Sequence, residues 1–231
     1  MRKKLSKDAV LLEYEPEPGT PKDTVKPMLN VVPNWYKELQ RHLKTPYGEF
    51  ESIKACVPFL DSLTTGYYIA LSQDVFIEQT ENGPVMRWAK EPQPGFNRPP
   101  GQTGKMPAPA GYSPEHLIWH TKAAVRLPDG YSALFTHPLN RFDLPFITLS
   151  GVVDGPFVVQ GGNIPFHVKE GFEGLIEEGT PILQIIPFLR ENWQSKEVEG
   201  TWDEGQEQTA SQDYAKGTWY RRRKWHKKTY K

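Results

Sequence analysis

Apolar and polar side chains alternate in short runs along most of the chain, and glycine or proline separates the runs. Residues 74–79 (DVFIEQ) alternate between polar and apolar positions, which predicts a half-exposed strand. The apolar run at 67–71 predicts a buried strand, and 181–188 predicts a strongly apolar strand. Further strands are predicted at 85–88, 117–120, 123–125, 131–136, 157–160 and 164–168. Turns recur at roughly ten-residue intervals, which is typical of a β-sandwich or barrel.

The two ends of the chain lack this pattern. Residues 1–50 are rich in proline and charge, and they predict an extended arm with one short helix from Asn34, its N-cap, to about Lys44. Residues 51–193 hold the predicted strands and therefore the β core. Residues 194–231 begin as a polar, acidic linker and end in the basic, aromatic tail GTWYRRRKWHKKTYK. The fold prediction is mainly β, as a sandwich or barrel with an N-terminal arm and a C-terminal tail.

Composition removes several classes of protein. The 231 residues include 28 basic and 28 acidic side chains, so no net field points to nucleic acid. One cysteine, Cys56, excludes an internal disulfide and a cysteine-based metal site. No apolar run approaches the ~20 residues of a membrane span, and the basic N-terminus lacks the apolar segment of a secretory signal. We therefore expect no membrane partner and an intracellular or virion location.

The stretch 136–157 (THPLNRFDLPFITLSGVVDGPF) is the strongest candidate for chemistry. Its apolar run ends in Asp154 between two glycines, which indicates a buried strand that delivers a carboxylate to a turn. His137 and Asp154 are candidate catalytic acid–base residues, with Asn140, Arg141 and Asp143 as binding residues of the same polar pocket. The alternative is that these polar side chains satisfy backbone groups that an irregular, proline-kinked segment leaves unpaired.

Two other features are weighed in the same way. His116 and His120 stand four apart, but a strand would separate them by about 13 Å, which is too far for one metal ion. No metal site is therefore predicted, and His167 is expected to face solvent or an interface. In the tail, the candidate binding residues for single-stranded nucleic acid or an acidic protein surface are Arg221, Arg222, Arg223, Lys224 and Trp225. The alternative is a solvated tail, or one paired with the acidic linker.

The order of several short motifs resembles the trimeric dUTPase and dCTP deaminase superfamily, which has a β-clip fold. The matching segments are 65–67 (TGY) with 74–77 (DVFI), 127–131 (LPDGY), 151–154 (GVVD) and 179–185 (GTPILQI). The resemblance covers about half of the chain. It implies a β-clip-like or jelly-roll core, a trimer, Asp154 as the carboxylate that orients the attacking water, and a structural role for Gln184.

The chain also departs from that superfamily. Tyr68 stands where the first motif has aspartate, and 136–139 (THPL) stands where the second motif has its phosphate-binding turn. The glycine-rich tail that closes over phosphate is replaced by the basic, aromatic one. Most of the diphosphohydrolase residues are therefore missing.

A second resemblance covers nearly the whole chain. The strings 135–146 (FTHPLNRFDLPF) and 149–154 (LSGVVD) are similar to a family of tailed-bacteriophage proteins, especially of T4-like phages of cyanobacteria. The segments 33–37, 58–67 and 179–188 extend the likeness. This resemblance implies a viral origin but no particular chemistry.

Three functions remain open from the sequence. The first is a non-enzymatic phage virion or assembly protein, without a cofactor, that passes from host cytoplasm to virion and grips itself and other virion proteins through its arms and loops. The second is a dUTPase- or dCTP deaminase-like enzyme with magnesium bound through the nucleotide phosphates. The third is a cupin-like barrel that binds a small molecule or metal.

Overall fold

The computed structural model describes residues 10–99, 101–102, 104–156, 158–159, 162–198, 220–221 and 224–231. The helical elements are η1 (Met28–Val31), α1 (Asn34–Glu38), η2 (Ile53–Ala55) and α2 (Val57–Thr64), where η marks a 3-10 helix. The strands are β1 (Glu13–Pro16), β2 (Val25–Pro27), β3 (His42–Thr45), β4 (Gly48–Glu51), β5 (Tyr67–Ala70), β6 (Val75–Thr80), β7 (Gly83–Trp88), β8 (Gly95–Phe96), β9 (Tyr112–His120), β10 (Ala123–Arg126), β11 (Tyr131–Thr136), β12 (Phe146–Thr148), β13 (Gly151–Asp154), β14 (Val158–Val159), β15 (Asn163–Lys169), β16 (Gly174–Ile176) and β17 (Pro181–Leu189).

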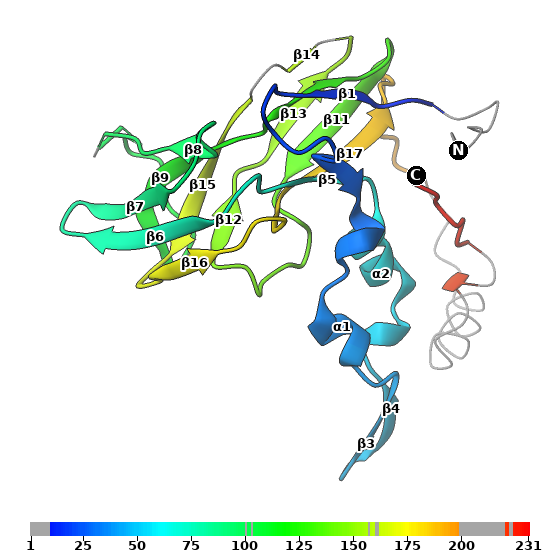
Figure 1. The fold of residues 1–231 in the computed structure, drawn as a ribbon. Helices are drawn as coiled ribbons and strands as arrows, with labels where there is room; N and C mark the ends of the chain where they lie inside the picture. The colour runs from blue at the N-terminus through cyan, green and yellow to red at the C-terminus, as the bar shows by residue number, and fades with distance from the viewer. Residues whose placement is uncertain are drawn as a thin grey trace.

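The fold is mainly β, as predicted, and its strand pairs are antiparallel. A five-stranded sheet has the order β13-β11-β17-β5-β2, and a four-stranded sheet has the order β12-β15-β9-β8. Two three-stranded sheets, β16-β6-β7 and β1-β10-β14, flank them (Figure 1). The helices lie below this β body, and the hairpin β3–β4 projects beyond them.

Three aromatic rings mark the centre of the core. Trp119 of β9 stacks on Phe166 of β15 at 3.7 Å between ring centroids, and Phe146 of β12 meets both rings edge-on. All three are buried, because alternate residues of these paired strands face the core. Burying such rings contributes about 2–3 kcal/mol each from apolar area alone.

The strand predictions at 67–71, 74–79, 85–88, 117–120, 123–125, 131–136, 164–168 and 181–188 are confirmed within a few residues at their ends. In the predicted strand 157–160, β14 covers Val158–Val159, while residues 157 and 160 lie outside the described part. The proline-rich segment 1–50 supplies β1 and β2, which pair with β10 and β5 at sheet edges. An extended segment without a core of its own is held there by backbone pairing.

The predicted helix from Asn34 to about Lys44 is wrong beyond Glu38. Leu39 has an extended backbone, and the chain then turns into the hairpin β3–β4. Gly48, with a φ of +123°, makes that turn, and the hydroxyl of Thr45 donates to its carbonyl. Asn34 is the first helical residue, not the cap, which is Pro33. Among the described residues, no helix is long and apolar enough to cross a membrane.

Candidate functional site

His137 lies at the end of β11, where the chain leaves the sheet. Its Nδ1 accepts a hydrogen bond from the backbone N–H of Thr148 at 3.3 Å, and its Nε2 lies 3.2 Å from the carbonyl of Arg141. The first contact assigns the proton to Nε2, so both ring nitrogens are engaged by backbone. Burial lowers the pKa of His137, which keeps the ring neutral. This geometry favours a structural role for His137 over the predicted catalytic one.

Arg141 and Asp143 form a bidentate ion pair with N–O distances of 2.8 and 2.9 Å. Arg141 is buried and also donates to the carbonyl of Val31, and the Trp35 indole donates to Asp143. Burial alone raises the pKa of Asp143, but the hydrogen bonds and charge of Arg141 outweigh it and hold that pKa below its ordinary value. The pair therefore ties η1 and α1 to the 137–145 loop.

Asn140 and Gln184 complete this set of contacts. Asn140, with a left-handed φ of 59°, donates to the Ser62 hydroxyl at 2.6 Å. Gln184 is fully buried; it accepts from the N–H of Leu139 and donates to the carbonyl of Thr65, both at 2.7 Å. The structural role predicted for Gln184 is confirmed. The polar side chains predicted as a binding pocket instead join the loop, helix α2 and strand β17.

Asp154 lies elsewhere. The predicted single buried strand is wrong, because the chain breaks after Thr148 into β12, which is largely buried, and β13, an exposed edge strand. Asp154 pairs with Ser132, at the start of β11, whereas His137 follows its end. Five residues of strand separate the two positions by about 17 Å. Within one chain, His137 and Asp154 therefore lie too far apart to share a proton directly.

Asp154 itself is solvent-exposed and held in one direction. The Ser132 hydroxyl donates to its Oδ1 at 2.6 Å, and the Arg190 guanidinium lies 4.0 Å away. Arg190 also approaches Asp129 at 3.6 Å and donates to the carbonyl of Gly155. The arrangement can orient a carboxylate toward solvent.

The C-terminal tail folds back onto the core. The Trp225 indole donates to both carboxylate oxygens of Asp61 on α2, and the Lys228 ammonium pairs with the same carboxylate. Tyr230 packs edge-on against Tyr67, with ring centroids 5.6 Å apart. Arg221 lies 6.0 Å above the Trp225 ring. Of the predicted tail residues, Arg222 and Arg223 lie outside the described residues.

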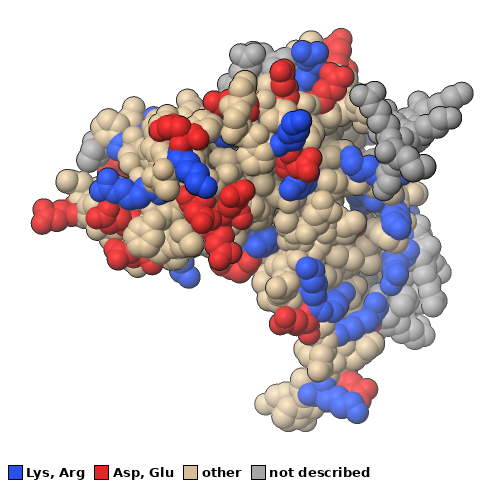
Figure 2. Space-filling model, in the orientation of Figure 1, with Lys and Arg blue, Asp and Glu red and all other residues tan. Residues whose placement is uncertain are grey.

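Figure 2 shows lysine and arginine side chains along the side of the molecule where this tail runs in Figure 1. Lys224 is exposed, but the Trp225 ring is half-buried because its indole is bound to Asp61. The tail is therefore a docked basic ridge whose anchoring aromatic rings face the core.

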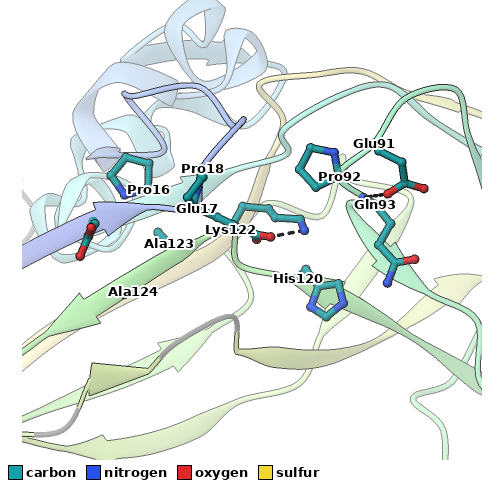
Figure 3. Close-up of a pocket in the computed structure, with 11 residues that line it drawn as sticks. Pro16, Glu17, Pro18, Glu91, Pro92, Gln93, His120, Lys122, Ala123 and Ala124 are labelled. Atoms are coloured by element: carbon teal, nitrogen blue, oxygen red, sulfur yellow. Dashed lines mark hydrogen bonds and ion pairs between the residues drawn. The ribbon is translucent and has the colours of Figure 1, made fainter.

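The sequence did not reveal one hollow, of about 840 Å³, between β1, the segment 91–93 and the β9–β10 turn. At its base the Lys122 ammonium pairs with Glu17 at 3.0 Å, and His120 lies beside it (Figure 3). Lys122 is buried and has a left-handed φ of 52°. No sequence motif marks this place, because its walls come from three separate segments. Among the described residues, no group of three metal-binding side chains occurs.

No family model matches the sequence, and no curated protein matches it. Solved structures similar to this chain include the EIAV dUTPase, at 9% identity and a TM-score of 0.35, over 84% of this chain and 100% of that one. The dUTPase of the S. aureus phage phi11 is similar at 14% identity and a TM-score of 0.27, over 55% and 99%. The Staphylococcus phage 80alpha dUTPase is similar at 15% identity and a TM-score of 0.26, over 56% and 98%.

Proposed function

We propose that the chain is a non-enzymatic structural protein of a bacteriophage particle, which binds copies of itself and other virion proteins through exposed elements. The observation that carries this proposal is the hairpin β3–β4. Within the described part of the chain its strands pair only with each other, and they project from the body (Figure 1). A two-stranded ribbon is at best marginally stable alone in water, so a surface on a neighbouring molecule is its natural support.

The hairpin carries the side chains that such a contact needs. Leu43 and Phe50 face each other across the strands, and Phe50 is 54% exposed. Tyr47 at the tip is 90% exposed. An aromatic tip that the protein's own core leaves open supplies large apolar area at a small cost in side-chain entropy. The base is fixed, because the Ser52 hydroxyl and N–H bond to the carbonyls of Gln40 and Arg41.

A second exposed surface supports self-association. On the face of the five-stranded sheet opposite the core, Leu134 lies between Val152 of β13 and Ile186 of β17, with Phe188 nearby. Val152, on the edge strand β13, is 64% exposed, and Phe188 is 42% exposed. An apolar edge strand invites pairing with a second copy. We call Leu134, Val152, Ile186 and Phe188 the apolar sheet face, and assign it to a homotrimer.

Oligomeric mass measured by light scattering tests the sheet face. The wild-type protein is expected to form a trimer, and Val152→Asp to form a monomer that keeps its circular dichroism spectrum. Leu175, exposed on β16 away from that face, supplies the control, Leu175→Asp. A wild-type monomer at tens of micromolar would contradict the self-association.

The hairpin is tested on particles. Mass spectrometry of purified virions is expected to detect the protein, and a Tyr47→Ser/Phe50→Ser variant is expected to be absent from virions although it folds. If virions never contain the wild-type protein, the structural role is wrong.

A second candidate is a nucleotide hydrolase or deaminase of the dUTPase type, favoured by the exposed Asp154 that Ser132 and Arg190 hold in place. Because the described residues offer no three-ligand metal group, magnesium would be held by the nucleotide phosphates. A panel of nucleoside triphosphates, assayed for pyrophosphate and ammonia, tests this function. Turnover that Asp154→Asn abolishes would support it, and no turnover with any nucleotide would remove it.

A further inference from the structure

Two buried histidines face each other on the central strands of the four-stranded sheet. His116 of β9 and His167 of β15 are register partners, and their rings meet edge-on with centroids 5.8 Å apart. His167 is completely buried, and His116 is 7% exposed. The prediction that His167 faces solvent or an interface is therefore wrong. It fails because Phe166, His167 and Val168 are all buried, so polar and apolar alternation does not mark an exposed face on this strand.

The hydrogen bonding of the pair is incomplete. Nδ1 of His167 lies 2.8 Å from the carbonyl of Ser113 and donates to it, which leaves a lone pair on Nε2. Among the described residues, no hydrogen-bond partner meets the His167 Nε2, the His116 Nδ1 or the Arg98 Nε. Native proteins rarely leave three buried polar atoms unpaired at one place, and such atoms mark a site that serves something other than stability.

The surroundings decide what these rings do. A metal ion is disfavoured for two reasons. The pair offers only two imidazoles, and the positive charge of the nearby Arg98 guanidinium would repel a cation bound to His116. The charged groups near His116 are Arg98, which follows β8, and Glu115 on β9 itself, while β12 places uncharged Ile147 opposite His167. The Glu115 carboxylate also accepts from the N–H of Gly101. Burial, then Arg98 and His167, lower the pKa of His116, and Glu115 opposes them.

The backbone pairing is irregular at the same place. The β9–β15 register shifts between His167 and Lys169, so the ladder is interrupted directly beside the histidines. Bulges of this kind recur beside functional sites, where pairing ends or a side chain is re-aimed. A positive charge on His116 would face the Arg98 guanidinium in a buried place. The nearest way to hydrate that charge is to separate the strands at the bulge.

We infer that the His116–His167 pair is an acid-operated switch that opens the β9–β15 ladder at Tyr112–His116 and His167–Lys169. The closed form holds His116 neutral, and the open form exposes His116 to water and binds a proton. Because His116 binds protons less readily in the closed form, closure is fully stable above the ordinary histidine pKa of about 6.5 and weakens as the pH falls below it. This device is independent of both functions proposed above.

Hydrogen exchange read by mass spectrometry tests the switch on the full chain, after correction for the intrinsic pH dependence of exchange. One histidine that stays neutral while closed makes opening about tenfold more frequent at pH 5.5 than at pH 7.5. Peptides that cover 112–116 and 163–169 are expected to show this change. Equal protection at the two pH values would overturn the inference.

Variants localise the effect. His116→Gln is expected to abolish the pH dependence in these peptides. Arg98→Met, a second variant in case His116→Gln does not fold, raises the pKa of His116 in the closed form and is expected to reduce the acid sensitivity. His42→Gln, on the exposed hairpin, is expected to behave as wild type. Peptides around His137, a half-buried histidine whose pKa is also lowered, report any general acid unfolding. Full acid sensitivity in His116→Gln would contradict the switch.

Discussion

At the scale of residues, the polar side chains of 137–143 serve the backbone rather than a substrate. His137 binds two backbone groups, Arg141 caps the carbonyl of Val31, and Asn140 adopts the left-handed conformation that its type tolerates. An irregular segment inside a fold must find partners for its N–H and C=O groups away from regular strands. Residue types alone do not distinguish this use from catalysis, since both need histidine, arginine and aspartate in a sheltered place.

Arg141→Met tests the structural reading. The change leaves the Asp143 carboxylate without its ion pair and the Val31 carbonyl without a donor, so we expect a loss of about 2–3 kcal/mol, below the full cost of a buried pair because Asp143 is partly exposed. Urea denaturation measures this loss. Arg41→Met, which removes a half-exposed pair with Glu51, is the matched control and should cost less than about 1 kcal/mol.

The Arg141–Asp143 pair also makes the stability of the protein depend on pH. The pKa of Asp143 is lowered in the folded state, so the stability it contributes is present above the ordinary aspartate pKa of about 3.9 and is lost as the pH falls below it. In Arg141→Met, the free energy of unfolding should therefore fall less between pH 6 and pH 3 than it does in the wild type. An unchanged difference between wild type and variant from pH 6 to pH 3 would contradict the assignment.

At the scale of elements, the alternation of polar and apolar residues was sufficient to predict most strands of the core. It did not predict the hairpin β3–β4 or helix α2. The run 181–188 is mostly apolar in sequence, and in the structure it is buried from Pro181 to Ile185, while Phe188 at its end is exposed. The hairpin β3–β4 was missed, since each of its strands carries a single large apolar residue, Leu43 or Phe50, which is too few to show alternation. Helix α2 had one start signal, Pro58 in its first turn, but at eight residues it is too short to show a helical period.

Gly66, between α2 and β5, is an element boundary that only glycine fits. Its φ is +75°, and an added Cβ would lie 2.1 Å from the carbonyl oxygen of Ile185 on β17. Gly130 has a similar φ of +79° but open space around it. Both alanine variants carry the left-handed strain of about 1–2 kcal/mol, and only Gly66→Ala must also push β17 away.

Chemical denaturation of the two variants separates strain from collision. We expect Gly130→Ala to lose about 1 kcal/mol and Gly66→Ala to lose more than about 3 kcal/mol. Equal losses would mean that the Gly66 backbone relaxes, and that the α2–β5 junction does not depend on this close approach.

At the scale of the whole molecule, the chain ends are part of the body. The N-terminal residues 10–12 and the C-terminal residues 229–230 line the same hollow beside Tyr67 and Pro187. The sequence indicated a basic tail and an acidic linker. The predicted partners of the tail were that linker, single-stranded nucleic acid or an acidic protein surface. The contact with Asp61 was not foreseeable, because it joins positions 164 residues apart through one carboxylate on a helix that the pattern did not predict.

Asp61→Ala tests whether that carboxylate holds the tail. The variant removes the carboxylate that accepts from the Trp225 indole and pairs with Lys228. We expect tryptic cleavage at Lys224, Lys227 and Lys228 to become about tenfold faster, since cleavage follows the population of the undocked tail. Trp225 should also become more exposed to a fluorescence quencher. Glu49→Ala, which breaks an exposed pair with Lys44, is the control and should leave the cleavage rate unchanged. Equal cleavage of the Asp61 variant and wild type would mean that Tyr230 on Tyr67 is sufficient to dock the tail. The basic ridge would then keep its place without α2.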